Sequence, residues 1–384
     1  MILPTRALLS RRAFLAGTAG GALAAVAGCG PSADRSAASQ LTDLRGRPLK
    51  VTAPAGKLSI DDGRYLIGLA LIHPDPVSLL AAWSGDINRI SPEMYAAFVE
   101  KSPALASLPK TPSSAQDFSV EAVLGASPSV AVVSLGQGPT DDQVSQLEAA
   151  GVQVAFIDFF THPFENQAKS LSLLGALVGR QEQAEAYTAF RAAKLKTIAD
   201  KVAGLPEDRR PTVLLEAHAG QTPDCCNSPG KGNVGDYISF VGGRNIGADV
   251  LKGPFGKLNL EYVVDRDPDV YIATGGPHLE KAGGYVVGPQ YSAEQSQAAL
   301  RKVASRRGIA SLKAVTGGRT HGLSHQLINS PIDIVATEAM AKWIHPELFA
   351  DLDPRKTLDE INTRFLAVPY RGEYWTDLPA NTAA

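Results

Sequence analysis

The chain has 384 residues, a length that favours two domains, because an ordinary domain takes about 150 residues. Apolar residues make up 44% and charged residues 20%. This composition is typical of soluble globular proteins and disfavours a disordered chain, a coiled coil and a polytopic membrane protein. With 37 Lys and Arg against 39 Asp and Glu, the chain lacks the basic excess of a nucleic-acid-binding protein. Three cysteines cannot form a disulfide framework.

The N-terminus reads as an export signal followed by an anchor. Residues 10–15 (SRRAFL) carry the paired arginines of a twin-arginine signal. The apolar stretch 15–27 is too short to span a bilayer, which takes about 20 apolar residues. Residues 26–29 (VAGC) resemble a bacterial lipoprotein box, which predicts cleavage before Cys29 and acylation of its thiol. The alternative is a plain signal peptide in which Cys29 has no special role.

The body of the chain contains one internal repeat. Residues 118–124 (FSVEAVL) and 128–134 (PSVAVVS) align without gaps with residues 258–264 (LNLEYVV) and 268–274 (PDVYIAT). Each copy predicts a short helix with a polar cap, a turn at proline and a buried strand. The copies lie 258 − 118 = 140 residues apart, which is too far for a solenoid. The repeat therefore predicts two similar α/β lobes.

Helical and strand patterns alternate along the chain. Apolar residues recur at helical spacing from 163 to 202, with Gly175 and Gly179 as weak points, which predicts a long helix between the lobes. Short apolar runs predict strands at residues 64–72, 152–159, 212–217 and 320–323. Further helices are expected near 236–241, 333–344 and 358–365. The alternation favours mostly parallel sheets wound with helices.

Four local motifs, taken in order, resemble one known family. They are SVEAV at 119–123, GGRNIGAD at 242–249, LE at 260–261 before DPDV at 267–270, and KWIHP at 342–346. The chain is similar, over residues 49–365, to the solute-binding proteins of bacterial ABC importers for ferric siderophores, haem and corrinoids. HPDP at 73–76 and WSGD at 83–86 depart from the usual start of that family.

The resemblance implies a class III periplasmic binding protein fold. This is an α/β fold of two lobes with mostly parallel sheets, joined by a single long inter-lobe helix, with the ligand in the cleft between them. We expect a signal at 1–28, a flexible tether at 29–48, an N-terminal lobe at 49–162, the inter-lobe helix at 163–203 and a C-terminal lobe at 204–384.

Candidate ligand-binding residues follow the predicted strands, because ligands of open α/β sheets bind outside the carboxyl ends of the strands. They are His73, Gln137, Phe160, His162, His218, His278 and His325. Five of the seven histidines fall just past a predicted strand, when His162 is counted among them and His321 and His345 are left aside. Neutral imidazole is a common metal ligand, so this pattern indicates metal or metal-chelate chemistry.

The adjacent pair Cys225 and Cys226 lies in a Pro- and Gly-rich loop. Two buried thiols, a disulfide that stiffens a loop facing the cleft, and a soft-metal or redox site all remain open. Two adjacent cysteines alone do not supply the four ligands of a zinc site. Lys231 in the same loop is a candidate contact for an anionic ligand.

Aromatic side chains suit a chelate with flat organic arms. Trp83, Phe160, Tyr285 and Tyr291 fall in predicted loops or helix starts and are candidates for a wall of the site. Ordinary packing is the alternative for each of them.

Glu121 and Glu261 occupy the same place in the two repeats. A glutamate at a helix start is favourable beside the helix dipole, which is one explanation. In the resembling family an equivalent glutamate on each lobe meets basic residues of the permease, so both are candidate docking points.

We therefore expect a binding protein and not an enzyme, since the chain has no G-x-S-x-G, P-loop or H-E-x-x-H motif. The resemblance implies that it captures an iron chelate, a ferric siderophore or haem, and delivers it to a permease and its ATPase. Cobalamin, a bare Zn or Mn ion, and a periplasmic metalloenzyme using His218, Cys225 and Cys226 are alternatives. We expect no intrinsic cofactor, no nucleic-acid partner and a monomer. The protein would be lipid-anchored at the periplasmic face of the inner membrane, or at the extracellular face of the cell membrane.

Overall fold

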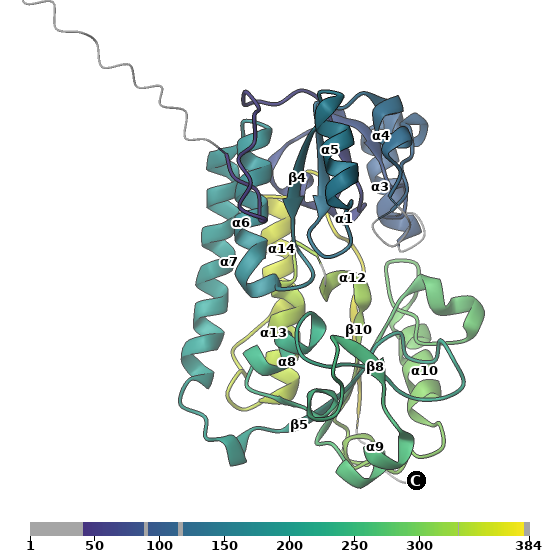
Figure 1. Cartoon of the computed structure of the whole chain (residues 1–384). Helices are drawn as coiled ribbons and strands as arrows, with labels where there is room; N and C mark the ends of the chain where they lie inside the picture. The colour runs from purple at the N-terminus through teal and green to yellow at the C-terminus, as the bar shows by residue number, and fades with distance from the viewer. Residues whose placement is uncertain (1–40, 88–90, 114–117, 329, 380–384) are drawn as a thin grey trace, which may run out of the picture. The chain divides into compact units, whose positions relative to one another are not determined.

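The computed structural model describes residues 41–87, 91–113, 118–328 and 330–379 (Figure 1). The twin-arginine motif and Cys29, both inferred from the sequence, lie outside the described residues. Within the described part, no helix combines the length and the apolar character needed to cross a membrane.

The first half of the chain forms a four-stranded parallel sheet in the order β2-β1-β3-β4. Its strands are β1 (Leu58–Ile60), β2 (Leu80–Trp83), β3 (Val130–Ser134) and β4 (Gln153–Ile157). The helices of this half are α1 (Arg64–Ile72), α3 (Pro92–Lys101), α4 (Val120–Ala126) and α5 (Asp141–Ala149), with short 3-10 turns at Val77–Leu79 and Pro103–Ser107. This arrangement is the N-terminal lobe.

One predicted strand is a helix. Residues 64–72, which we expected to be a strand, form α1, and eight of its nine residues are buried. A short apolar run of this length reads alike as a buried strand or as a helix buried on all sides, so periodicity alone does not separate the two. The correction moves His73 from a strand end to the C-terminus of a helix.

The expected inter-lobe helix is present as two helices, α6 (Pro163–Leu177) and α7 (Gln181–Val202). The helical conformation is interrupted between them at Gly179, whose φ of 68° lies in the left-handed region that glycine adopts without steric cost. The two helices pack on each other, and α7 also packs against α1 and α13 (Ile334–Ile344) (Figure 1).

The second half forms a five-stranded sheet in the order β11-β10-β9-β5-β7. Its strands are β5 (Thr212–Glu216), β7 (Arg244–Asn245), β9 (Val270–Gly275), β10 (Thr320–Ser324) and β11 (Trp375–Leu378). Only β11 runs antiparallel to its neighbour within this sheet. A separate antiparallel pair joins β6 (Asn227–Pro229) to β8 (Phe255–Lys257).

The helices of this second half, the C-terminal lobe, vary widely in length. They are α8 (Val234–Phe240), α9 (Leu260–Arg266), α10 (Ala293–Ala304), α11 (Lys313–Thr316), α12 (His325–Ile328), α13 and α14 (Pro354–Arg364), with 3-10 turns at Glu207–Arg209, Ile246–Asp249 and Pro277–Ala282.

The sequence repeat corresponds to a structural repeat. Helices α4 and α9 each have seven residues, begin after a capping side chain (Ser119 and Asn259) and end at a left-handed residue (Ser127 and Asp267). A buried strand follows each helix, β3 in one lobe and β9 in the other. The duplicated helix–turn–strand unit predicted from the sequence is thus confirmed.

The largest apolar core is continuous across both lobes. It includes side chains of β1, α1 and α6 together with those of α8 and α13. A buried ion pair lies within this region, because the Arg191 guanidinium donates two hydrogen bonds of 2.7 Å to Asp333, which also accepts one from the Tyr237 hydroxyl. The helices between the lobes are therefore fixed by both apolar packing and a buried charge pair.

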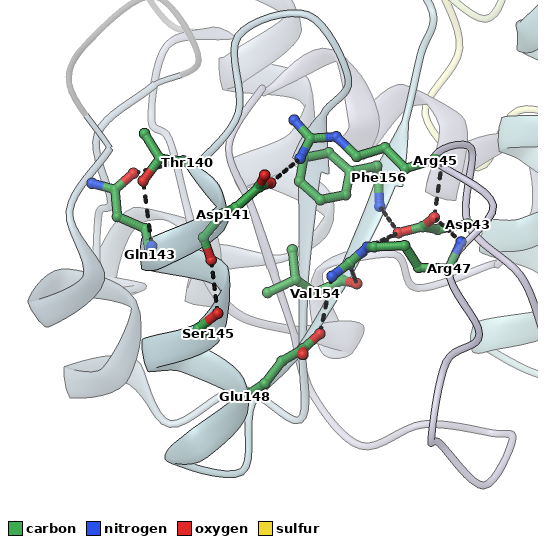
Figure 2. Close-up of polar contacts among 10 residues, drawn as sticks. All are labelled: Asp43, Arg45, Arg47, Thr140, Asp141, Gln143, Ser145, Glu148, Val154 and Phe156. Carbon is green, nitrogen blue, oxygen red and sulfur yellow. Dashed lines mark hydrogen bonds and ion pairs between the residues drawn. The ribbon is translucent and has the colours of Figure 1, made fainter.

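The segment 42–48 covers the outer edge of β4 (Figure 2). The Leu44 N–H donates to the Phe156 carbonyl at 3.0 Å, and the Arg47 guanidinium donates to the Val154 carbonyl at 2.6 Å. The Arg45 guanidinium lies 3.6 Å from the centre of the Phe156 ring. An edge strand otherwise presents unpaired backbone groups, so this part of the expected tether occupies the open side of the N-terminal sheet.

Candidate functional site

A pocket of about 690 Å³ opens where the loops of the two sheets face each other. The N-terminal lobe contributes Arg64 and the loops that follow β3 and β4. The C-terminal lobe contributes the loops that follow β5 and β10, together with strand β8. The pocket therefore lies at the carboxyl ends of parallel strands from both sheets, where open α/β sheets bind ligands.

Arg64 and Phe160 form one face of the pocket. The Arg64 guanidinium lies 3.8 Å from the centre of the Phe160 ring, and this ring stacks on Tyr65 at 5.9 Å between centroids. Asp62, whose side chain is 1% exposed, holds the guanidinium through bonds of 2.9 and 2.6 Å. Arg64 thus brings a positive charge and a flat surface to the pocket in a fixed orientation.

The loop that carries Phe160 is organised by the carboxylate of Asp158. This carboxylate accepts the N–H groups of Phe160, Thr161 and His162, and the side-chain amide of Asn166, at 2.7 to 3.0 Å. Burial raises the pKa of Asp158, but these hydrogen bonds outweigh it, so the pKa lies below its ordinary value. Asp158 is therefore ionised at neutral pH, and its acceptor capacity is used within the loop.

Histidines form a second face of the pocket, which the C-terminal lobe contributes. The Nδ1 atom of His218 lies 2.8 Å from the Nε2 atom of His278, and the ring of His218 lies 4.1 Å from that of His325. The Thr274 hydroxyl lies 3.1 Å from the Nδ1 atom of His325. His218 and His325 line the pocket. His218 also has a φ of 52°, an uncommon conformation for a residue other than glycine.

The imidazoles of His218 and His325 are neutral at neutral pH. Burial lowers the pKa of His218. Burial also lowers the pKa of His325 well below its ordinary value, and His218, Arg64 and His278 lower it further through charge repulsion. The cations that line the pocket are thus Arg64, which is paired with Asp62, and Lys257, which reaches the pocket from β8 and pairs with Asp224 at 3.1 Å.

Cys225 and Cys226 are joined by a disulfide. Both are buried, and the chain continues directly into Asn227, which lines the pocket. Of the possibilities left open by the sequence, the structure shows the disulfide. It braces the loop between β5 and β6 beside the pocket.

A three-ligand metal group is found at one place in the described part of the chain, where Glu216 meets the two cysteines within 4.8 Å. Disulfide sulfurs are not thiolates, which are the form that binds metal. The carboxylate of Glu216 is already held by Arg306, at 2.9 Å for one of its bonds, and by Tyr271 at 2.6 Å. This group therefore does not form a metal centre, and the alternative of a bare Zn or Mn ion gains no support from the described residues.

Several residues proposed from the sequence meet at the pocket. Gln137, Phe160, His218 and His325 line it, and His278 contacts His218. These residues could be identified from the sequence because each follows a strand of one of the two sheets, and ligands of such sheets bind beyond the carboxyl ends of the strands.

Other proposed residues lie elsewhere. His73 follows helix α1 and bonds to the Asp75 carbonyl in an exposed loop. Trp83 belongs to β2 and Tyr285 packs in the C-terminal core, both fully buried, so the expected four-ring aromatic wall does not form. His162, Lys231 and Tyr291 are not among the side chains that line the pocket.

Four residues that line the pocket were not predicted from the sequence: Arg64, Asn227, Asn233 and Lys257. Arg64 opens a helix that we had predicted to be a strand. The other three come from the β6–β8 pair and the loop before α8, which follow no strand of the main sheets. A cation at the start of an apolar run was the one signal that could have indicated Arg64.

Comparisons with known proteins agree with this geometry. A family model described as Periplasmic binding protein matches residues 69–326. No curated protein matches the sequence. Among solved structures, the TroA-like periplasmic binding protein FepB from Veillonella parvula is 25% identical with a TM-score of 0.79, covering 88% of this chain and 99% of that one.

Two more distant structures show the same fold. The molybdate-binding protein MolA from Haemophilus influenzae has a TM-score of 0.66 at 16% identity, covering 87% of this chain and 99% of its own. A periplasmic haem-binding protein from Pseudomonas aeruginosa has a TM-score of 0.53 at 20% identity, covering 76% and 94%. Their ligands differ, so at these identities the comparison concerns the fold alone.

Proposed function

The chain belongs to the periplasmic binding protein family, and we propose that the solute it carries to its importer is an anionic iron chelate, a ferric siderophore or haem. As a member of this family it is the solute-binding, non-enzymatic component of an ABC importer.

The observation that carries the proposal is the pairing of two unlike faces across one pocket. Arg64 and Lys257 place cationic donors at the pocket, paired with Asp62 and with the exposed Asp224 respectively, whereas the Asp158 carboxylate already accepts backbone N–H groups of its own loop. A pocket lined by two cations, and by a carboxylate whose oxygens are already engaged in hydrogen bonds, favours an anionic ligand. Its volume of about 690 Å³ suits an organic ligand rather than a bare ion.

The histidine face supports a metal in that ligand. Neutral imidazole is a good ligand or hydrogen-bond partner for a metal chelate, and burial keeps His218 and His325 neutral. The Phe160 ring beside Arg64 adds a flat surface for an aromatic arm.

We further propose that Cys29 carries a lipid anchor and that the twin-arginine signal directs export. Both rest on the sequence motifs alone. A Cys29→Ser variant should move from the membrane fraction to the soluble extracytoplasmic fraction. Retention of that variant in the membrane would contradict the anchor.

The test of the ligand is isothermal titration calorimetry with a ferric tris-catecholate, a ferric trihydroxamate, ferric citrate, haemin, cobalamin, Zn²⁺ and Mn²⁺. The three tryptophans do not line the pocket, so intrinsic fluorescence would report binding only indirectly. We expect binding to at least one ferric chelate or to haemin. Binding of cobalamin alone, or of a bare ion alone, would replace the proposal by one of those alternatives.

Point variants connect the binding to this pocket. Arg64→Gln and His218→Gln should each lower the affinity about tenfold or more, because a hydrogen bond to a charged group contributes about 1.5–3 kcal/mol. His73→Gln is the matched control, since His73 lies in an exposed loop away from the pocket. Equal affinities for all three variants would place the ligand elsewhere.

A further inference from the structure

Asn233 has a backbone conformation that normally requires glycine. Its φ is 50° and its ψ is −126°, a combination that a Cβ atom disfavours. A residue in such a conformation persists only where its surroundings hold it, and such residues cluster at functional sites. Asn233 follows Gly232 and caps α8 at the wall of the pocket.

Besides the helical bond that its carbonyl accepts from the Asp236 N–H, three hydrogen bonds hold this residue. Its Oδ1 atom accepts the Val234 N–H at 2.7 Å, which is the helix cap. Its backbone N–H donates to the Thr161 carbonyl at 3.0 Å, and its Nδ2 atom donates to the Phe160 carbonyl at 2.7 Å. The last two bonds leave the C-terminal lobe and end on the loop that follows β4 of the N-terminal lobe.

Capping alone does not explain this arrangement. Ser119 and Asn259 cap their helices from an ordinary extended backbone, with φ of −112° and −69°. Neither needs the left-handed conformation, so the conformation of Asn233 serves its two donor bonds to the other lobe.

The bonded loop carries one face of the pocket. Phe160 supports Arg64 at 3.8 Å, and Asp158 fixes the loop from within. The histidine face belongs to the C-terminal lobe, as does Asn233. The two bonds of Asn233 therefore set the spacing between the two faces.

We propose that Asn233 is a positioning residue for the ligand. It donates hydrogen bonds to the backbone carbonyls of Phe160 and Thr161. These bonds hold the Arg64–Phe160 face at the distance from His218 and His325 that the ligand requires. A pocket whose walls are already in place loses less conformational freedom on binding, which strengthens affinity. The proposal deepens the function proposed above and rests on it for the nature of the ligand.

Two substitutions distinguish the hydrogen bond to the Phe160 carbonyl from the helix cap on the Val234 N–H. Asn233→Gly keeps the backbone conformation without strain and removes the bond to Phe160. Asn233→Asp keeps an acceptor for the Val234 N–H and places a carboxylate oxygen against the Phe160 carbonyl. Asn259→Gly is the matched control, because it removes the same kind of cap from α9, whose residues do not line the pocket.

Two readouts are needed. The first is the affinity for haemin and for the ferric tris-catecholate by calorimetry, alongside the melting temperature. The second is the ¹⁹F resonance of 4-fluorophenylalanine placed at position 160, recorded in the ligand-free protein. We expect both Asn233 variants to fold, to lose about tenfold in affinity, and to show a shifted or broadened ¹⁹F line, whereas Asn259→Gly keeps the wild-type affinity and line.

The possible outcomes test the positioning role of Asn233 separately from the nature of the ligand. Wild-type affinity in both Asn233 variants would overturn the positioning role, whether or not the ¹⁹F line moves. An affinity loss in Asn259→Gly equal to that of Asn233→Gly would also overturn it, since the effect would then be a general loss of stability. If the wild-type protein binds neither haemin nor any of the three ferric chelates titrated above, the proposed iron chelate is wrong, and the ¹⁹F comparison alone decides whether Asn233 holds the Phe160 face.

Discussion

The Nδ1 atom of His218 lies 2.8 Å from the Nε2 atom of His278, so the hydrogen bond between the two imidazoles requires a proton on one nitrogen and a lone pair on the other. His325 packs against the same ring of His218. Adding a proton to this group would place a second positive charge near that of Arg64 in a buried environment. The cluster is therefore suited to its neutral form.

This relationship predicts a pH dependence of stability. Burial lowers the pKa of His218 and His325 in the folded protein, so the unfolded chain takes up protons first as the pH falls below about 6.5. Where the unfolded state binds more protons, stability decreases as the pH decreases. The stabilising effect of the neutral cluster is complete above about pH 7 and is lost as the pH falls through the lowered values.

Other groups act in the opposite direction, which decides the design of the test. Burial raises the pKa of Asp61 to about 8. The folded protein therefore binds this proton at a higher pH than the unfolded chain does, so this carboxyl group makes the folded state more stable as the pH falls. The measurement is therefore the difference in melting temperature between wild type and His325→Gln at pH 7.5, 6.5 and 5.5. We expect the variant to gain relative to wild type at the lower pH, with His73→Gln as a control that follows the wild-type curve. A difference that does not change with pH would contradict the neutral cluster.

The sequence predicted the two lobes because the repeat carries its own local signals. Ser119 and Asn259 are recognisable caps, and the apolar strands after Pro128 and Pro268 are short and uninterrupted. Both signals depend only on neighbouring residues, so tertiary contacts did not override them.

The pocket was predictable only where it follows the sheets. Gln137, Phe160, His218 and His325 come directly after strands. Arg64 was missed because a helix buried on all sides has no polar face and reads as a strand. Asn233 was missed because its role depends on the carbonyl groups of Phe160 and Thr161, which lie more than seventy positions earlier in the chain.

The carboxylate of Asp43 is the centre of the segment that covers β4 (Figure 2). It accepts the N–H groups of Arg45, Arg47 and Phe156 and two bonds from the Arg47 guanidinium, and its side chain is fully buried. Asp43→Asn leaves several of these donors without a charged acceptor. We expect the free energy of unfolding to fall by about 2–4 kcal/mol, because removing one partner of a buried charged group leaves the other unpaired.

Denaturant unfolding at pH 7 measures this loss. Asp200→Asn is the matched control, since Asp200 forms an exposed pair with Lys196. Exposed pairs contribute about 0–1 kcal/mol. Equal stabilities for the two variants would show that the segment 42–48 lies on β4 without stabilising the N-terminal lobe.

Glu121 and Glu261 lie at matched positions of the structural repeat. Each is exposed in the first turn of a seven-residue helix, α4 in one lobe and α9 in the other. Neither lines the pocket. We propose that the two carboxylates form salt bridges to basic residues of the permease, one per lobe, as the resemblance to the importer family implies.

Charge reversal tests this role without touching the ligand. Glu121→Lys and Glu261→Lys should each impair uptake, and the double variant should transport worst, because loss of one partner of a desolvated interfacial charge pair typically costs about 2–5 kcal/mol. Affinity in solution for the chelate should remain at the wild-type value. Glu182→Lys is the control, since Glu182 is also an exposed glutamate in a first helical turn, that of α7. Normal uptake by the double variant would mean that the two glutamates only complement the helix dipoles, whereas reduced ligand affinity would place them in contact with the pocket.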